Sequence, residues 1–156
     1  MQTFSTGAID SDVRVYVDSS ALVKRSIEEP ESDALDAVLE AHVDGGGALL
    51  SSSLAWIEVG RALRSRLTDD RFDEATVNEA IEVAMSGIAE RAMTTEVVSL
   101  ARRIAPATLR ALDAVHLATA IVLDADLVVV YDGRLADACR HHGLAVVAPG
   151  SGTQEI

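Results

Sequence analysis

Four acidic residues of this 156-residue chain lie in or beside apolar segments, where a charged carboxylate is costly. They are Asp18, Glu58, Asp113 and Asp132. Four carboxylates brought to one place repel one another and raise one another's pKa unless cations lie among them. Oxygen ligands without cysteine favour Mg²⁺ or Mn²⁺ over Zn²⁺. Because such ions polarise a phosphodiester and generate a hydroxide nucleophile, the acidic set makes phosphate chemistry the leading class of function.

Two of these acids belong to one long apolar stretch. Residues 110–124 predict a buried helix, because only three side chains between the ends of this segment are polar. Those three are Asp113, His116 and Thr119. The next residues, Ala-Asp-Leu-Val-Val-Val-Tyr at 125–131, are β-branched and apolar without alternation, which is typical of a strand covered on both faces. Asp132 ends this strand, and the loops at the carboxyl ends of strands form the ligand crevice in open α/β sheets.

Asp18 follows a strand predicted for residues 13–17 and precedes Ser19 and Ser20, after which a helix begins at Ala21. Aspartate and serine both suit the N-cap of a helix, so Asp18 has a purely structural alternative. Either serine could cap the helix instead. The carboxylate of Asp18 is then free to project from the end of the strand.

Glu58 belongs to a long helix that follows a second buried strand, predicted for residues 48–51. The helix runs from residue 52 or 53 to about residue 67 and has one broad apolar face that includes Trp56. Glu58 lies outside that face. The alternative for Glu58 is a surface ion pair with Arg61, three residues further on.

The rest of the chain supplies further short elements. We predict helices at 31–42, 72–88, 95–104 and 135–141, a weakly marked strand at 91–94 and a last strand at 144–147. About five buried strands alternating with six or seven helices are typical of a parallel sheet with helices on both faces. We therefore expect one three-layer α/β/α domain, with the carboxyl ends of its strands at a single edge. Its predicted limits are 13–149, with a flexible leader at 1–12 and a flexible tail at 150–156.

The composition limits where and how the protein acts. The longest apolar runs fall far short of the roughly 20 residues that cross a bilayer, and a single cysteine, Cys139, fits a reducing compartment. We therefore expect a cytoplasmic protein with no membrane contact. The net charge of −12 excludes an extended basic groove for nucleic acid. The protein then binds no nucleic acid, or binds a little of it through metal ions that bridge phosphates to carboxylates, or has a basic partner.

Four short motifs follow one another along the chain. They are YVDSSALVK at 16–24, IEVGRAL at 57–63, LDAVHLATA at 112–120 and VYDGRLADACRHHGL at 130–144. In order and spacing they resemble the motifs of PIN-domain ribonucleases of the VapC toxin type, and the resemblance covers nearly the whole of residues 13–149. It implies a PIN-like fold and an endoribonuclease, dependent on Mg²⁺ or Mn²⁺, that is the toxin of a toxin–antitoxin pair. It also implies that Asp18, Glu58, Asp113 and Asp132 form the catalytic and metal-binding site.

The same resemblance assigns supporting residues. Ser20 matches the hydroxyl that commonly follows the first acid of the family, and we expect it to hold Asp18 in place without binding the metal itself. His116 is expected to be a hydrogen-bonded partner of neighbouring groups rather than a metal ligand. The family often has Ser or Thr two residues before its last acid, and this chain has Val130 there. No hydroxyl from that position then supports Asp132.

The expected partners follow from the acidic site. A few basic residues are modest candidates for contact with RNA, and single-stranded loops or RNA shape would supply the specificity. These candidates are Lys24, Arg61, Arg64 and Arg134. We expect a cognate antitoxin to direct a basic or aromatic tail toward the acids, since negative charge at a cleft holds cations. The apolar faces around Trp56 and along residues 72–88 predict a twofold homodimer.

Two other classes of protein fit part of the pattern. A receiver-like phosphoacceptor domain also places aspartates and Mg²⁺ at strand ends, but it needs paired acids after its first strand and a lysine after its last. Here Asp18 is followed by serines, and the last strand leads into Ala148 and Pro149. A PIN-like binding protein that has lost catalysis is the remaining alternative, and the presence of all four acids argues against it.

Overall fold

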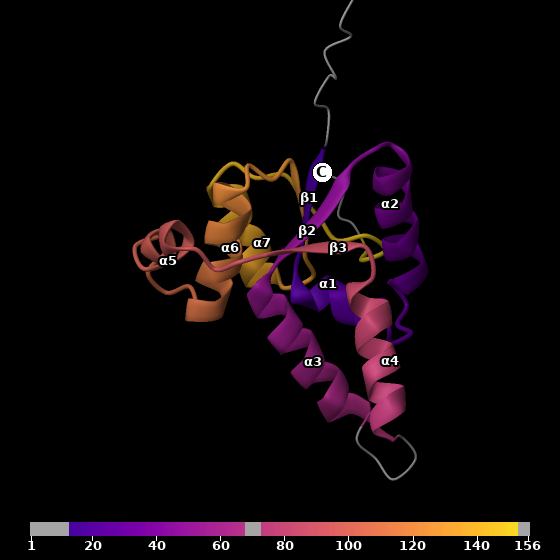
Figure 1. Cartoon of the computed structure of the whole chain (residues 1–156). Coiled ribbons are helices and arrows are strands. Elements are labelled where there is room, and N and C mark those ends of the chain that lie inside the picture. Colours follow the sequence, from indigo (N-terminus) through magenta and orange to yellow (C-terminus); the bar gives the residue numbers. More distant parts are fainter. Residues whose placement is uncertain (1–12, 68–72, 153–156) are drawn as a thin grey trace, which may run out of the picture.

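The structure, a computed structural model, describes residues 13–67 and 73–152. The predicted leader at 1–12 and most of the predicted tail at 150–156 lie outside these ranges. Strands and helices alternate along the described residues (Figure 1). The elements are β1 (Arg14–Val17), α1 (Ser19–Val23), α2 (Ser32–Asp44), β2 (Ala48–Ser52), α3 (Ser53–Leu67), α4 (Glu74–Met85), β3 (Ile88–Arg91), α5 (Thr95–Ala101), α6 (Ala111–Val122), β4 (Leu127–Val129), α7 (Gly133–His141) and β5 (Val146–Val147).

The described strands form one parallel sheet in the order β3-β2-β1-β4-β5. β1 lies at the centre, where Tyr16 is level with Leu50 of β2 and with Val128 of β4. The predicted α/β architecture with a central parallel sheet of about five strands is confirmed. Because neighbouring strands run the same way, the carboxyl ends of β1, β2 and β4 share one edge of the sheet.

β1 contributes to both halves of the core, because successive side chains of a strand point to opposite faces of a sheet. Val15 and Val17 belong to a cluster of buried residues with side chains of α1, α2, α3 and α4. Tyr16 belongs to a second cluster, formed with side chains of α6 and α7. In Figure 1, α3 and α4 lie side by side and extend below the sheet, while α5 and α6 lie to its left. Helices therefore cover both faces, which gives the sheet its three-layer form.

The outer strands differ from their predictions. β3 spans Ile88–Arg91, whereas the sequence predicted a strand at 91–94 and a helix as far as residue 88. The helix α4 already ends at Met85, and Gly87 turns the chain with a φ of +73°, a conformation that glycine adopts without strain. β5 is also shorter than its prediction at 144–147. The predicted start of the α4 helix, at residue 72, lies outside the described residues.

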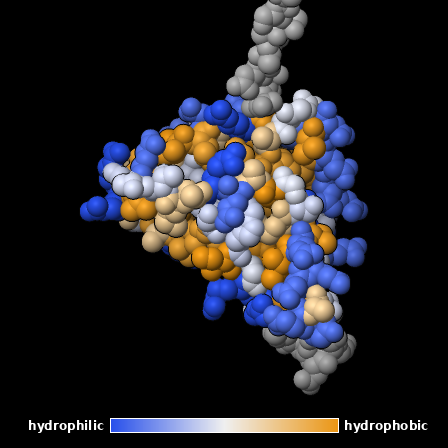
Figure 2. All heavy atoms as spheres, in the orientation of Figure 1, coloured by the Kyte–Doolittle hydropathy of each residue, from blue (hydrophilic) through white to orange (hydrophobic). Residues whose placement is uncertain are grey.

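The apolar faces behind the homodimer prediction are largely used inside the subunit. Trp56 of α3 is partly buried and packs on the first core cluster, as do Ala80 and Ile81 of α4. Among large apolar side chains of these two helices, Ile57 and Val83 stay exposed. In Figure 2 hydrophilic residues cover the outer side of α2, and apolar residues show between the elements nearer the centre. No helix in the described part of the chain is long and apolar enough to cross a membrane.

Two leucines of α6 provide a matched test of the core. Leu117 is 0% exposed within the second cluster, whereas Leu112 is 51% exposed. We predict that Leu117→Ala lowers the free energy of unfolding by about 2–5 kcal/mol, because it removes buried methyl groups and leaves a cavity. Leu112→Ala should change this free energy by less than about 0.5 kcal/mol. Urea unfolding of the three chains measures both effects, and equal losses would contradict the division of α6 into a buried and an exposed face.

Candidate active site

The four acidic residues singled out in the sequence line one cavity of about 550 Å³. Asp18 follows β1 and Asp132 lies just beyond β4, at the shared carboxyl edge of the sheet. Glu58 comes from α3, and Asp113 comes from the first turn of α6. The pairing of β1 with β4 continues to the edge of this cavity, where Asp18 N–H donates to the carbonyl of Val129 at 3.0 Å. Four segments that are distant in sequence therefore meet at one place.

Asp18 is buried and is itself the N-cap of α1. Its Oδ2 accepts hydrogen bonds from Ser20 N–H at 3.1 Å and from the Ser20 hydroxyl at 2.7 Å. The structural alternative for Asp18 is therefore present, and neither Ser19 nor Ser20 caps the helix in its place. β1 ends at Val17 and α1 begins at Ser19, so Asp18 occupies the only position between them. Its other oxygen, Oδ1, lies 3.6 Å from His116 Nε2.

Ser20 joins Asp18 to the segment that carries Asp132. While its hydroxyl donates to Asp18, the Ser20 oxygen accepts from Tyr131 N–H at 3.0 Å. Asp132 is the N-cap of α7, where its Oδ1 accepts from Leu135 N–H at 3.0 Å. Both carboxylates thus accept hydrogen bonds from backbone N–H groups at helix N-termini. Ser20 is therefore placed to keep the two acids in a fixed relation.

His116 connects Glu58 to the sheet. Its Nε2 hydrogen-bonds to Glu58 Oε1, and its Nδ1 lies 2.6 Å from the hydroxyl of Tyr16. Ser52 N–H donates to the same hydroxyl at 3.2 Å, so Tyr16 can donate its own proton to Nδ1. Neutral His116 then carries its proton on Nε2, and a protonated imidazole carries one there as well. In both charge states Nε2–H donates to Glu58, which orients that carboxylate.

This hydrogen bond takes the place of the ion pair with Arg61 that was the alternative for Glu58. Burial lowers the pKa of His116, but the hydrogen bond to Glu58 and the charges of Asp18, Glu58 and Asp113 outweigh burial. The pKa of His116 therefore lies above its usual value. His116 is buried, and both of its ring nitrogens form hydrogen bonds. This is the arrangement expected of a hydrogen-bonded partner of neighbouring groups.

Asp113 is the acid with the least local support. Its carboxylate forms no hydrogen bond and no salt bridge within the described residues, unlike those of the other three acids. Burial raises its pKa first, and the negative charges of Asp132 and Asp18 raise it further. Arg110 and His116 oppose the shift without cancelling it. The repulsion expected from gathering the acids is therefore concentrated on Asp113.

The donor set of this cavity fits a hard divalent cation. The acids offer oxygen atoms only, and Asp113 has a carboxylate that lacks a partner within the described residues. No three acidic, histidine or cysteine side chains of that part of the chain converge as a ready-made ligand cage. Mg²⁺ does not need such a cage, because it keeps several waters and commonly binds through one or two carboxylates and substrate phosphates. Asp113, Asp132 and Asp18 are the residues that could hold it.

Lys24, a predicted contact for RNA, lines the same cavity but is already neutralised. Its ammonium group forms salt bridges with Glu29 and Glu31 and lies 4.7 Å from the centroid of the Tyr131 ring. Arg66, at the end of α3, pairs with the same Glu29 at 2.9 Å. This rim therefore carries little unbalanced positive charge.

The other basic candidates lie elsewhere. Arg64 pairs with Glu74 of α4 at 2.6 Å, on the exposed side of α3. Arg61 is exposed on α3 and does not line the acidic cavity. Arg134 lines a neighbouring cavity between α6 and α7. Of these three arginines, Arg134 alone faces a cavity that adjoins the acids.

The reasoning from sequence missed Tyr16 and the backbone of Ser52, which hold His116 in place. A signal for Tyr16 was present, because a hydroxyl in a strand buried on both faces needs a hydrogen-bond partner. No comparable signal existed for Glu29 and Arg66, which line the cavity from a loop and from the end of α3. Their places depend on how the elements pack.

Known proteins with the same fold and sequence pattern exist. The sequence profile of the family described as PIN domain matches residues 15–141. Ribonuclease VapC47 of Mycobacterium tuberculosis is 35% identical over 139 residues, which cover 88% of this chain and 98% of the relative. Ribonuclease VapC46 of the same species is 40% identical over 137 residues, which cover 86% and 97% of the two chains.

A solved structure shares the fold at much lower sequence identity. VapBC2 from Rickettsia felis, bound to a DNA fragment from its promoter, superposes with a TM-score of 0.67 at 11% identity. The match covers 86% of this chain and 97% of that one. The fold is that of a PIN domain. On the profile match and the two relatives, the chain belongs to the PIN-domain family and, within it, to the VapC ribonucleases.

The hydrogen-bond chain through His116 predicts a stability effect. Tyr16→Phe removes a hydroxyl that serves His116 Nδ1 and Ser52 N–H, and leaves both groups buried without a partner. We predict a loss of about 1–3 kcal/mol in the free energy of unfolding. Tyr131→Phe is the matched control, because its hydroxyl donates only to the partly exposed carbonyl of Pro149 at 2.8 Å. Denaturant unfolding that gave the control the larger loss would contradict this reading of Tyr16.

Proposed function

We propose that this chain is a Mg²⁺-dependent or Mn²⁺-dependent endoribonuclease that cleaves RNA phosphodiester bonds with a metal-activated water. We propose further that it acts in the cytoplasm as the toxin of a toxin–antitoxin pair. One observation carries the proposal: four acids from four separate segments line one cavity at the carboxyl edge of the sheet. The named ribonuclease relatives support the choice of RNA as substrate.

The chain's own residues divide the work in this proposal. Asp18, Asp113 and Asp132 hold the cation, and Glu58 completes the acidic site. When bound, the ion supplies Lewis-acid chemistry that polarises a phosphoryl oxygen and lowers the pKa of a water. Ser20 fixes one oxygen of Asp18, and the N-terminus of α7 fixes one oxygen of Asp132. Both acids are therefore positioned before substrate arrives, which is what catalysis by preorganised charge requires.

Glu58 has a different place in the proposal. Its carboxylate accepts the Nε2–H of His116, which in turn is fixed by Tyr16. Because only Oε1 of Glu58 is hydrogen-bonded to His116, its second oxygen is available in the cavity. There it can accept a proton or a hydrogen bond from water. Glu58 therefore suits the orientation of the attacking water better than tight coordination of the ion. Tyr16 and His116 are positioning residues in this scheme.

An antitoxin is the proposed protein partner. The Rickettsia felis structure, a VapBC2 complex, supports such a partner for a VapC chain. The acid-lined cavity and the net charge of −12 favour a basic or aromatic tail that enters it. The homodimer stays a prediction, and Ile57 and Val83 are exposed apolar side chains that a second copy could cover.

The metal dependence is the direct test of the activity. We predict that the purified chain cleaves RNA with Mg²⁺ or Mn²⁺, loses cleavage in EDTA, and regains it when Mg²⁺ is added in excess. The reason is that carboxylates alone cannot neutralise the negative charge that develops on the phosphoryl and leaving oxygens, whereas a bound cation can. Gel analysis of RNA over time measures this dependence. Robust cleavage in EDTA would require a metal-free mechanism and would overturn the proposal.

Asp113→Asn separates catalysis from folding. Activity should fall by orders of magnitude, because the change removes a charge that holds the cation. In EDTA the melting temperature should rise or stay level, because the raised pKa of Asp113 means that its ionised form destabilises the folded chain. The difference from the wild type should grow as pH rises above about 4, the pKa of an unfolded aspartate, and vanish in acid.

Asp33→Asn is the control for this test. Asp33 also lies in the first turn of a helix, α2, but is exposed and distant from the acids in sequence. Its substitution should leave activity unchanged. A clear loss of thermal stability in Asp113→Asn with RNase activity intact would show that Asp113 supports the fold, as a partner of Arg110, and not the reaction.

A further inference from the structure

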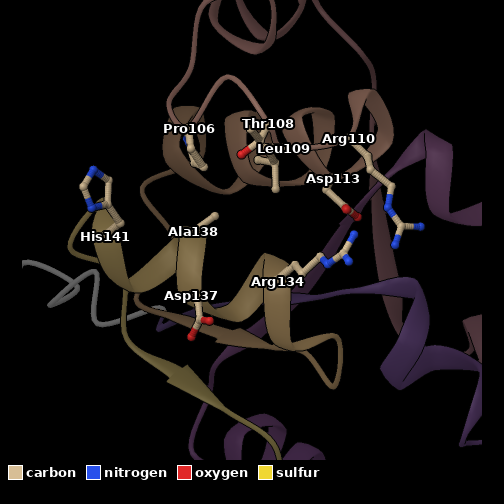
Figure 3. A pocket seen from close by; sticks show the side chains of 9 residues that line it. All are labelled: Pro106, Thr108, Leu109, Arg110, Asp113, Arg134, Asp137, Ala138 and His141. Carbon is tan, nitrogen blue, oxygen red and sulfur yellow. The ribbon is translucent and has the colours of Figure 1, made fainter.

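A second cavity, of about 600 Å³, opens beside the acidic one. It lies between α7 and the loop that leads into α6, and Asp113 lines both cavities (Figure 3). Arg110 and Arg134 lie at the end near Asp113, and His141 lies at the far end. We call this cavity the α6–α7 cleft. The two cavities therefore adjoin at Asp113.

The arginines of the cleft differ from most others in the described chain. Arg25 donates to backbone carbonyls, Arg64 pairs with Glu74, and Arg66 pairs with Glu29. By contrast, the guanidinium groups of Arg110 and Arg134 have no hydrogen-bond or ion-pair partner among the described residues. In a chain with a net charge of −12, unpaired positive charge beside a cavity is scarce. The main competitor of an anionic group in the cleft is the carboxylate of Asp113, which forms no ion pair with either arginine within the described residues.

The lining of the cleft also contains apolar and aromatic side chains, so it can bind a ligand that is larger than a simple anion. Leu109 and Ala138 provide apolar surface, and His141 adds a flat ring at the open end. Asp137 is an acidic member of the lining, but in Figure 3 its carboxylate points away from the cavity, and it pairs with Arg140 at 3.3 Å. A group with an anionic part and a flat, partly apolar part matches this combination. A nucleotide has both, and bases of single-stranded RNA commonly stack on histidine rings and arginine planes.

We propose that the α6–α7 cleft is a nucleotide subsite, which holds the RNA strand on one side of the phosphodiester that is cleaved. This inference rests on the proposed ribonuclease function and deepens it. Arg134 and Arg110 contact the phosphate next to the reacting one, the apolar wall receives the base, and His141 stacks on it. Phosphate contacts position the strand, so the cleft helps decide which phosphodiester reaches the acids.

RNA binding without cleavage tests the cleft. The background is the full chain with Asp18→Asn, which the proposed function predicts to be inactive, in Mg²⁺ with a labelled single-stranded RNA of random sequence. We expect Arg110→Gln and Arg134→Gln each to weaken binding by roughly three- to tenfold and to lower the slope of log K against log salt by about 0.7. Arg103→Gln is the control, because Arg103 is exposed and lines neither cavity.

A pair of neighbouring residues supplies a second control for charge. Thr108 and Ala107 are both exposed in the loop before α6, but only Thr108 lines the cleft. Thr108→Glu should weaken RNA binding clearly, and Ala107→Glu should change it little, although both add the same charge. In the otherwise wild-type chain, Arg134→Gln should raise KM with kcat nearly unchanged, since it removes binding that ground state and transition state share.

The outcomes keep the two proposals apart. If the cleft variants bind RNA like Arg103→Gln, or if the two glutamate variants lose binding equally, the subsite is wrong. Failure of the Asp18→Asn chain to bind RNA that the wild type cleaves would also overturn the subsite. If the cleft variants lose binding as expected while the wild type cleaves no RNA in Mg²⁺, the cleft is an RNA-binding site, but the proposed activity and the role of the cleft beside a cleaved phosphodiester both fall.

Discussion

One buried chain of hydrogen bonds joins the sheet to the acidic edge. It runs from Ser52 N–H through the hydroxyl of Tyr16 and the ring of His116 to the carboxylate of Glu58. It therefore links β2 and β1 of the sheet to α6 and α3, which lie in the two different layers of helices. An interrupted chain would leave polar groups unpaired in the second core cluster, where the penalty is large. The position of Glu58 is thus specified by the core, although Glu58 itself is partly exposed.

Among the four acids, Asp113 is the one that destabilises the folded state. Asp18 and Asp132 are compensated locally, because each caps a helix, whereas Asp113 has no such partner within the described residues. Its raised pKa records an electrostatic cost that the apolar packing of α6 must outweigh. Proteins commonly retain such local instability where a ligand or a reaction removes it. A cation or a basic protein tail would relieve the same repulsion, so the proposed catalysis and the proposed inhibition both depend on Asp113.

The sequence was informative where burial and charge coincide. Uninterrupted apolar runs located β1 and β4, and an acid at the end of each gave two members of the site. The sequence could not show that Asp18 caps α1, because Ser19 and Ser20 are equally good caps and only the length of the turn decides. The bond between His116 and Glu58 joins positions 58 residues apart and has no local signature. β3 was misplaced because a turn at Gly87 outweighed the helical pattern around it.

The net charge of the chain does not show where its surface can bind RNA. Within the described residues, Arg64 and Arg66 form ion pairs with acidic side chains. A count of basic residues therefore overstates the positive charge that is available to RNA. The useful positive charge is that of arginines beside the acids that form no ion pair among the described residues, and these are Arg110 and Arg134. The acidic cavity attracts a cation, and the neighbouring cleft contains the two arginines. The sign of the charge therefore alternates along this surface. RNA laid across it would meet metal at one phosphate and arginine at the next, with no need for a basic groove.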